Sequence, residues 1–203
     1  MLKPYRNALL LLLVAVIASG CASTQIVNAW QDPKFPGPPL ERVMVIDVTK
    51  RAGIRRTLED EFVRELAAKG VQGVASYTLI PEDGEVPKER FTQAVKESGV
   101  QGVLITRLVK VEVQTQVYYA GPYGRPPYFG FYGYYSWAWV GYYDPPQVYT
   151  YDVVTAETNL FDAVSDTLIW SGTTQTFAPR NAKKDAREFA NVIIKALSTS
   201  HII

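Results

Sequence analysis

The chain has 203 residues, of which 47% are hydrophobic and 20% charged, a balance that excludes disorder throughout. Lys and Arg number 21 against 20 Asp and Glu, so no basic excess exists that would attract nucleic acid. With one Cys and one His, the chain is not a disulfide scaffold, and neither a metal site nor a cofactor is expected.

Residues 1–20 have the pattern of a secretory signal peptide. Lys3 and Arg6 are the only charges before residue 32, and an apolar run extends from Ala8 to Ala18. A basic start, a short apolar centre and small residues at the end are typical of such signals. The run is shorter than the roughly 20 apolar residues that a membrane-spanning helix needs.

The end of this signal, Ile17-Ala18-Ser19-Gly20-Cys21, resembles the processing box of bacterial lipoproteins, although Ala18 stands where Leu is commoner. The resemblance implies cleavage before Cys21 and attachment of lipid, palmitate included, to its thiol and new amine. Several acyl chains give stable anchoring to a membrane. Ala22 in place of Asp implies, by the enterobacterial sorting rule, the outer membrane, with the protein facing the periplasm. An ordinary signal peptide with an incidental Cys is the alternative.

Residues 21–40 are expected to be a tether, and residues 41–203 a single periplasmic domain. The stretch Asp32–Pro39 contains four prolines, which exclude helix and interior strand and make a semi-rigid spacer. Ile26, Val27 and Trp30 could add a short edge strand to the domain.

The first half of the domain alternates strands with helices. Val43–Ile46 is a short apolar run typical of a buried strand, and a second strand is expected over Val71–Ile80. Between them, apolar residues recur every four positions and predict a helix that ends at Gly70. Its core stripe is Ile54, Leu58, Phe62 and Leu66, widened by Val63 and Ala67. A second helix is expected from Pro87 to Gly99.

The second half predicts a long antiparallel pair. Gly102–Tyr118 is a strand whose later residues alternate, with Val109, Val111, Val113 and Val117 expected on a buried face and Lys110, Glu112, Gln114 and Gln116 on a wet face. Val148–Phe161 is expected to be the antiparallel partner of this strand, and Thr167–Phe177 the last strand. Asn181 is expected to cap a final helix.

The expected fold is therefore α/β (α+β), in the order β-α-β-α-β-β-β-α. It has a mixed five-stranded sheet in the order 2-1-3-4-5, with helices packed on it. The segments Arg42–Ile46, Gly102–Thr106, Leu160–Asp162 and Leu168–Gly172 resemble those of a group of periplasmic lipoproteins. That group includes activators of penicillin-binding proteins, curli secretion-channel lipoproteins and the amino-terminal domain of TolB. The resemblance implies an adaptor or assembly part rather than an enzyme.

Side chains suited to chemistry are few. His201 lies at a fraying terminus, and Glu59, Asp60 and Glu61 read as a solvated charged face on the first helix. A hydrolase whose carboxylates meet in space stays open as a third alternative. A helix start with neighbouring cations could instead hold an anion such as a phosphate of a lipid or glycan. These candidate anion contacts are Lys50, Arg51, Arg55 and Arg56.

Residues 118–151 form a long insertion rich in Tyr, Gly and Pro at the tip of the long strand pair. It holds 11 of the 13 Tyr of the chain, and no charge occurs from Pro126 to Tyr143. Tyr and Trp are common at protein interfaces, and their rings also stack on sugars. A compact loop packed on itself is the alternative. The candidate partner- or surface-binding residues are Tyr128, Phe129, Phe131, Tyr132, Tyr134, Tyr135, Trp137, Trp139, Tyr142 and Tyr143.

These observations predict a lipid-anchored envelope protein that acts as a binding or assembly component at the outer membrane. Its expected partner is an envelope protein or peptidoglycan. The alternative is a glycan- or lipid-binding module that uses the aromatic insertion.

Overall fold

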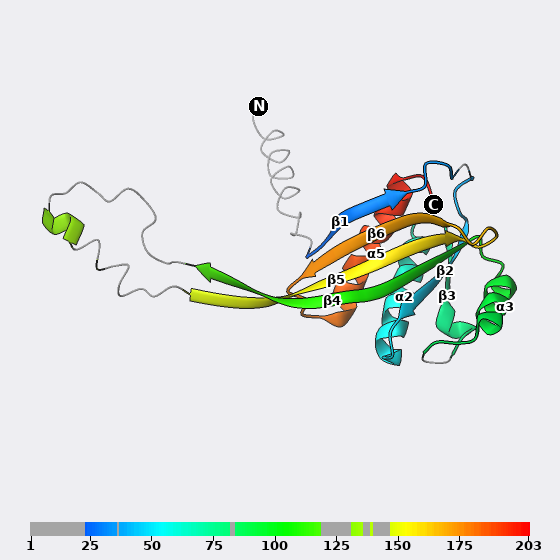
Figure 1. Cartoon of the computed structure of the whole chain (residues 1–203), viewed down its shortest axis with the longest axis horizontal. Helices are drawn as coiled ribbons and strands as arrows, with labels where there is room; N and C mark the ends of the chain where they lie inside the picture. The colour runs from blue at the N-terminus through cyan, green and yellow to red at the C-terminus, as the bar shows by residue number, and fades with distance from the viewer. Residues whose placement is uncertain (1–22, 36, 82–83, 119–130, 136–138, 140–146) are drawn as a thin grey trace, which may run out of the picture.

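The structure is a computed structural model of the whole chain, and it describes residues 23–35, 37–81, 84–118, 131–135, 139 and 147–203. The signal peptide, Cys21 and Ala22 lie outside the described residues. Figure 1 shows one sheet with helices behind and beside it, from which two strands extend far to one side.

The sheet has six strands in the order β1-β6-β5-β4-β2-β3. The strands are β1 (Thr24–Gln31), β2 (Arg42–Val48), β3 (Gln72–Ala75), β4 (Gly102–Tyr118), β5 (Gln147–Asp162) and β6 (Leu168–Phe177). The helices are α2 (Ala52–Ala67), the short 3-10 helix η1 (Ser76–Thr78), α3 (Lys88–Ser98) and α5 (Ala182–Thr199). The order predicted for the five strands from β2 to β6 is confirmed.

The predicted count of five strands was wrong, because part of the expected tether joins the sheet. β1 pairs antiparallel with β6 from Thr24↔Thr176 to Gln31↔Trp170. Its start is held by α5, whose Glu188 carboxylate accepts hydrogen bonds from the Ser23 hydroxyl at 3.1 Å and the Thr24 amide at 2.7 Å. These bonds fix an edge strand whose outward side chains remain exposed.

β2 is the centre of the parallel part, paired with β3 on one side and β4 on the other. The strand predicted over Val71–Ile80 is shorter than expected and gives way to η1 after Ala75. The Ser76 hydroxyl and the Tyr77 amide both donate to Glu59 of α2, which draws the chain out of the sheet plane.

Helices cover the two faces of the sheet unequally. α2 and α5 pack together on one face, where the rings of Phe62 and Phe189 meet edge to face with centroids 5.6 Å apart. α3 covers a smaller apolar cluster around Met44 and Val103 on the opposite face. The predicted core stripe of α2 holds at Phe62 and Leu66 but not at Ile54 or Ala67, which are exposed.

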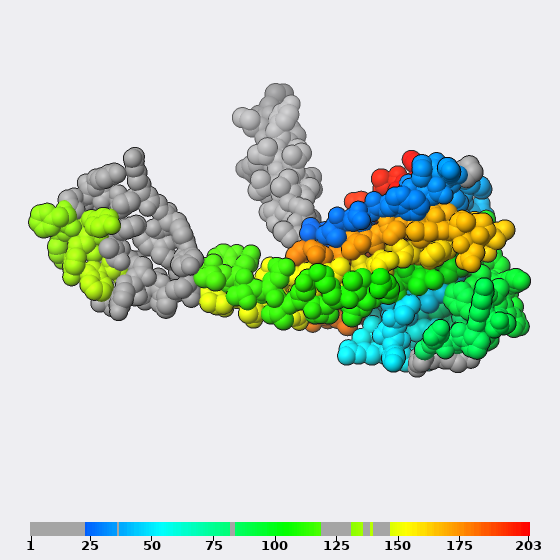
Figure 2. Space-filling view, viewed as in Figure 1, coloured from blue at the N-terminus to red at the C-terminus, as the bar shows by residue number. Residues whose placement is uncertain are grey.

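The outer halves of β4 and β5 form a two-stranded extension, called here the arm, comprising residues 108–118 and 147–152. Pairing of β4 with β2 stops at Arg107, and pairing of β5 with β6 begins only at Val153. Every residue of β4 from Arg107 to Tyr118 is exposed. The prediction of a buried valine face on β4 was therefore wrong, because no helix and no neighbouring strand extends that far. Figure 2 shows the arm projecting uncovered from the body on the side in view.

Candidate functional site

A cluster of buried charge lies where β2 ends and α2 begins. Glu59 is fully buried, and its Oε1 accepts from the Asp47 amide at 3.1 Å, Arg55 Nε at 3.1 Å and the Ser76 hydroxyl at 2.8 Å. Its Oε2 accepts from the Tyr77 amide at 3.1 Å. All four donors converge on this one buried carboxylate. The cluster therefore ties α2 to β2 and to η1.

The predicted solvated face on α2 was wrong for two of its three carboxylates. Besides Glu59, Glu61 is buried, and it forms ion pairs with Arg64 of its own helix and with Arg187 of α5, the latter at 3.4 Å. Only Asp60 is exposed, where it accepts from the Tyr77 hydroxyl at 2.6 Å. Helical spacing alone cannot separate a buried ion pair from an exposed one, so the sequence did not reveal this cluster.

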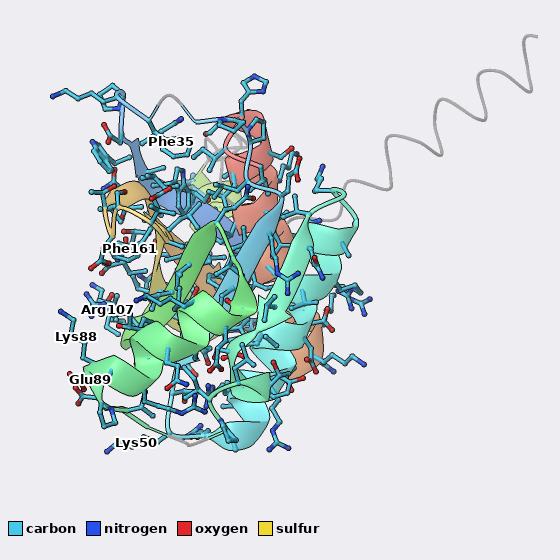
Figure 3. The ribbon with its side chains drawn as sticks, turned by 90° about the vertical axis from the view of Figure 1, so that its right-hand side faces the viewer. Phe35, Lys50, Lys88, Glu89, Arg107 and Phe161 are labelled. Carbon is cyan, nitrogen blue, oxygen red and sulfur yellow. The ribbon has the colours of Figure 1, made fainter. Side chains whose placement is uncertain are left out.

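The structure brings two of the four predicted anion contacts, Lys50 and Arg55, to the wall of one pocket at the carboxyl end of β2, and Arg51 and Arg56 do not line it. Arg55 is buried, and its Nη2 donates to the Ser76 hydroxyl and to the Ile80 carbonyl, each at 2.9 Å. Arg51 is exposed ahead of α2, and Arg56 lies over the ring of Tyr77, 5.7 Å from its centroid. Lys50 is exposed at the end of the molecule opposite Phe35 (Figure 3). Anion binding at this helix start remains a prediction.

A pocket of about 570 Å³ opens beside the charge cluster at the carboxyl end of β2. Apolar side chains make much of its wall, and Asp47, Lys50, Arg55 and Glu85 supply charge; the apolar members are Ile46, Val48, Ile80, Val86 and Phe91. Asp47 is only 8% exposed. Burial raises its pKa from 3.8 to about 7, and the nearby Glu59 charge adds to this effect while Arg55 opposes it. Asp47 can therefore exchange a proton near neutral pH.

The predicted aromatic residues fall into two groups. Tyr128, Phe129, Trp137, Tyr142 and Tyr143 lie outside the described residues. The others are all exposed; they are Phe131, Tyr132, Tyr134, Tyr135 and Trp139. The ring of Tyr135 lies 6.2 Å from that of Tyr132 and 5.9 Å from that of Trp139, measured between centroids. Figure 1 places this short helical segment beyond the far end of the arm.

The apolar side chains of the arm itself were missed as candidate surface residues. They are Leu108, Val109, Val111, Val113, Val117, Tyr118, Val148 and Tyr149, all more than two fifths exposed. A signal for them was present in the sequence: the expected strand over Gly102–Tyr118 is much longer than the run Val43–Ile46 beside which it was placed. A strand that is longer than its neighbours extends beyond the rest of the sheet, so its end is not covered by the core.

No described helix has the length and apolar character needed to cross a membrane. Among the same residues, no three His, Cys, Asp or Glu side chains gather into a group that could hold a metal ion.

The fold and its arm define a mixed α+β domain with a projecting two-stranded extension. The chain belongs to the family described as a domain of unknown function, DUF4136, whose model matches residues 47–200. No curated protein matches the chain.

Solved structures resemble the chain at low identity. One is a PelC dodecamer from Paraburkholderia phytofirmans, at 13% identity and a TM-score of 0.46, with 86% of this chain and 95% of that chain covered. Another is the lipoprotein GNA1162 from Neisseria meningitidis, at 9% identity and a TM-score of 0.40, with 78% of this chain and 98% of that chain covered.

Proposed function

We propose that this protein is a binding or assembly component of the bacterial envelope. In this proposal lipid on Cys21 anchors it to the outer membrane, the domain faces the periplasm, and the arm reaches a partner protein. The domain acts as an adaptor and not as an enzyme. The sequence pattern of residues 1–21 supports the anchor, and the arm supports the binding role.

The observation that supports the binding role is that the arm projects from the domain and has apolar side chains on its exposed surface. Val113 is 69% exposed, Val148 60% and Tyr118 58%. An isolated two-stranded ribbon is marginally stable in water, and clustered exposed apolar side chains mark contact sites in soluble proteins. These side chains do not pack in the domain core. A contact with another molecule would explain why apolar residues occupy these exposed positions.

The aromatic segment extends the same surface. Phe131 is 91% exposed and Tyr132 72%. Tyr and Trp are enriched at protein interfaces because they combine a large apolar area with a polar atom. We therefore place the partner contact on the aromatic segment and on the outer part of the arm.

A second candidate function is binding to the glycan strands of peptidoglycan. The neighbouring exposed rings of Tyr132, Tyr135 and Trp139 favour it, because sugar rings stack on such surfaces. A glycan contact and a protein contact would use the same segment but respond to different ligands.

Replacing Gly121–Pro146 by a short Gly-Ser turn tests the proposal. We expect the shortened protein to keep nearly the melting temperature of the full protein and to lose its partner in crosslinking in cells from β5 of the arm, which both proteins retain. Val164→Ser is the matched control, since Val164 is 93% exposed in the β5–β6 turn. Sedimentation with purified peptidoglycan that disappears in the shortened protein would favour the glycan candidate. An unfolded shortened protein, or unchanged crosslinks, would contradict the contact surface.

A further inference from the structure

The outer edge of β4 is unpaired along the arm. β2 occupies this edge as far as Val48↔Arg107, and β5 lies on the other side of β4 up to Tyr118↔Gln147. The backbone N–H and C=O groups that point away from β5 therefore meet no strand of the described residues from Leu108 to Tyr118. Such an edge is a template for pairing with another strand.

Natural sheets protect free edges with proline, with unpaired charge or with bulges, and this edge has little of that protection. No proline occurs from Leu108 to Tyr118. Its only cation, Lys110, is neutralised by Glu112 on the same strand, with Nζ and Oε2 2.8 Å apart. The one bulge lies between Leu108 and Lys110, at the end nearest the domain. The remaining edge is regular, exposed and rich in β-branched side chains.

The sequence of this edge is nearly symmetric about Val113. Residues at equal distances before and after Val113 are of the same kind. Where one is polar the other is polar, and where one is apolar or β-branched so is the other. The matched positions are 112 with 114, 111 with 115, 110 with 116, 109 with 117 and 108 with 118. Two copies of this strand, placed antiparallel, are therefore complementary to each other, as a two-fold interface requires.

We infer that two copies of this chain pair through the free edge of β4, with Val113 of one copy opposite Val113 of the other. This inference goes beyond the proposed function, because it concerns the edge of the arm and needs no part of the aromatic segment. The pair makes a continuous sheet in the order β5-β4-β4-β5. Lys110 then faces Gln116, and Glu112 faces Gln114, so no like charges are opposed.

Steric limits select this register. The register is set by the residue that lies opposite its own copy at the centre of the strand pair. If this central residue were closer to the domain than Val113, the end of one strand would collide with β2, which already pairs with β4 beside Arg107. A centre at residue 112 would also oppose two Glu112 side chains, which is unfavourable. A centre beyond Val113 would leave part of the edge unpaired. The Val113 register is the one that pairs all residues from Leu108 to Tyr118 without these conflicts.

The symmetry also argues for a second copy rather than an unrelated partner strand. A different partner would place no demand on the two halves of the edge to match each other. The strand pair is smaller than a standard interface of about 800 Å² per partner, so we expect a weak dimer that two-dimensional confinement on a membrane would favour.

Cysteine crosslinking in cells expressing the full chain tests the inference. Val113→Cys should give a covalent dimer on mild oxidation, because directly opposed Cβ atoms lie about 4.5–5.5 Å apart. Val111→Cys should crosslink in co-expression with Thr115→Cys and much less with itself. Thr150→Cys is the matched control, exposed on β5 of the same arm. A Val113→Cys yield no higher than that of Thr150→Cys, or a higher yield from Glu112→Cys, would overturn the inference.

Sedimentation of the purified full chain gives an independent readout. We expect a reversible monomer–dimer equilibrium at about 100 μM protein, in the weak range of affinity, and a single monomer for Val113→Lys, which opposes two cations. Val113 is exposed, so this variant should fold as the native protein does, which circular dichroism checks. A wild-type protein that stays monomeric at this concentration, or a Val113→Lys protein that still dimerises, would refute edge pairing. Neither result depends on a partner of the aromatic segment, so the two proposals fail separately.

Discussion

Replacing Asp47 by Asn should change how the stability of the domain depends on pH. The pKa of Asp47 is 3.8 in its ordinary state and about 7 in the folded protein. Below pH 3.8 the carboxyl is protonated in both the folded and the unfolded chain, so it has no effect on the pH dependence. Between these two values only the unfolded chain ionises, and the free energy of unfolding falls as pH rises. Above about pH 7 the loss is complete.

The size of this effect follows from the difference between the two pKa values. Each pH unit corresponds to 1.36 kcal/mol, so the full loss is about 4 kcal/mol at most. Hydrogen bonding is not among the causes of the raised pKa of Asp47, and we expect an Asn amide there to lack a partner, at a cost of about 1–3 kcal/mol. That second cost does not change with pH. Asp47→Asn should therefore be destabilising by about 1–3 kcal/mol near pH 4 and net stabilising by about 1–3 kcal/mol at pH 8.

Chemical denaturation of the two proteins at intervals from pH 4 to 9, followed by tryptophan fluorescence, measures this difference. Asp166→Asn is the control, because Asp166 lies in the exposed β5–β6 turn at φ 55°, a backbone conformation that Asn tolerates. If the difference in unfolding free energy between wild type and Asp47→Asn stays constant across this range, the raised pKa of Asp47 is refuted.

Three other changes have definite expected outcomes. Phe62→Ala removes a fully buried ring and should cost about 3–5 kcal/mol in denaturant titration; a loss below about 1 kcal/mol would show that α2 does not pack as described. Glu59→Ala leaves the buried Arg55 guanidinium without this carboxylate and should also cost about 3–5 kcal/mol, with Asp60→Ala as the exposed control. Cys21→Ser should move the protein out of the membrane fraction or leave it unprocessed, and palmitate labelling that persists in this variant would contradict the anchor.

Much of the fold could be predicted because it rests on short-range patterns. Gly70 and Gly99 adopt positive φ of 80° and 60°, which marks the ends of two helices in the sequence as in the structure. Asn181 caps α5 by accepting from the Lys184 amide at 3.0 Å, as its side-chain chemistry predicts. Apolar runs located β2 and β4, and the helices between the first strands indicated their parallel pairing.

The candidate site was less predictable because it depends on what covers each residue. The period of two along β4 predicted a valine face and a polar face, but the same pattern fits a strand with a core beneath it and a strand with none. Likewise the spacing of Arg55 and Glu59 fits an exposed ion pair and a buried one equally. Burial is decided by elements distant in sequence, which local spacing does not report.

From the sequence alone, most of the elements and the aromatic segment could be placed, since helix caps and apolar periods are local properties, whereas the place of β1 beside β6 could not. The sequence also contains the symmetry of the β4 edge about Val113. The tertiary structure decided that β2 stops at Val48 while β4 continues to Tyr118, and this difference in length leaves the edge free. The structure also brought Ser76 and Asp47 to Glu59, across a crossover that the residues of α2 alone do not specify.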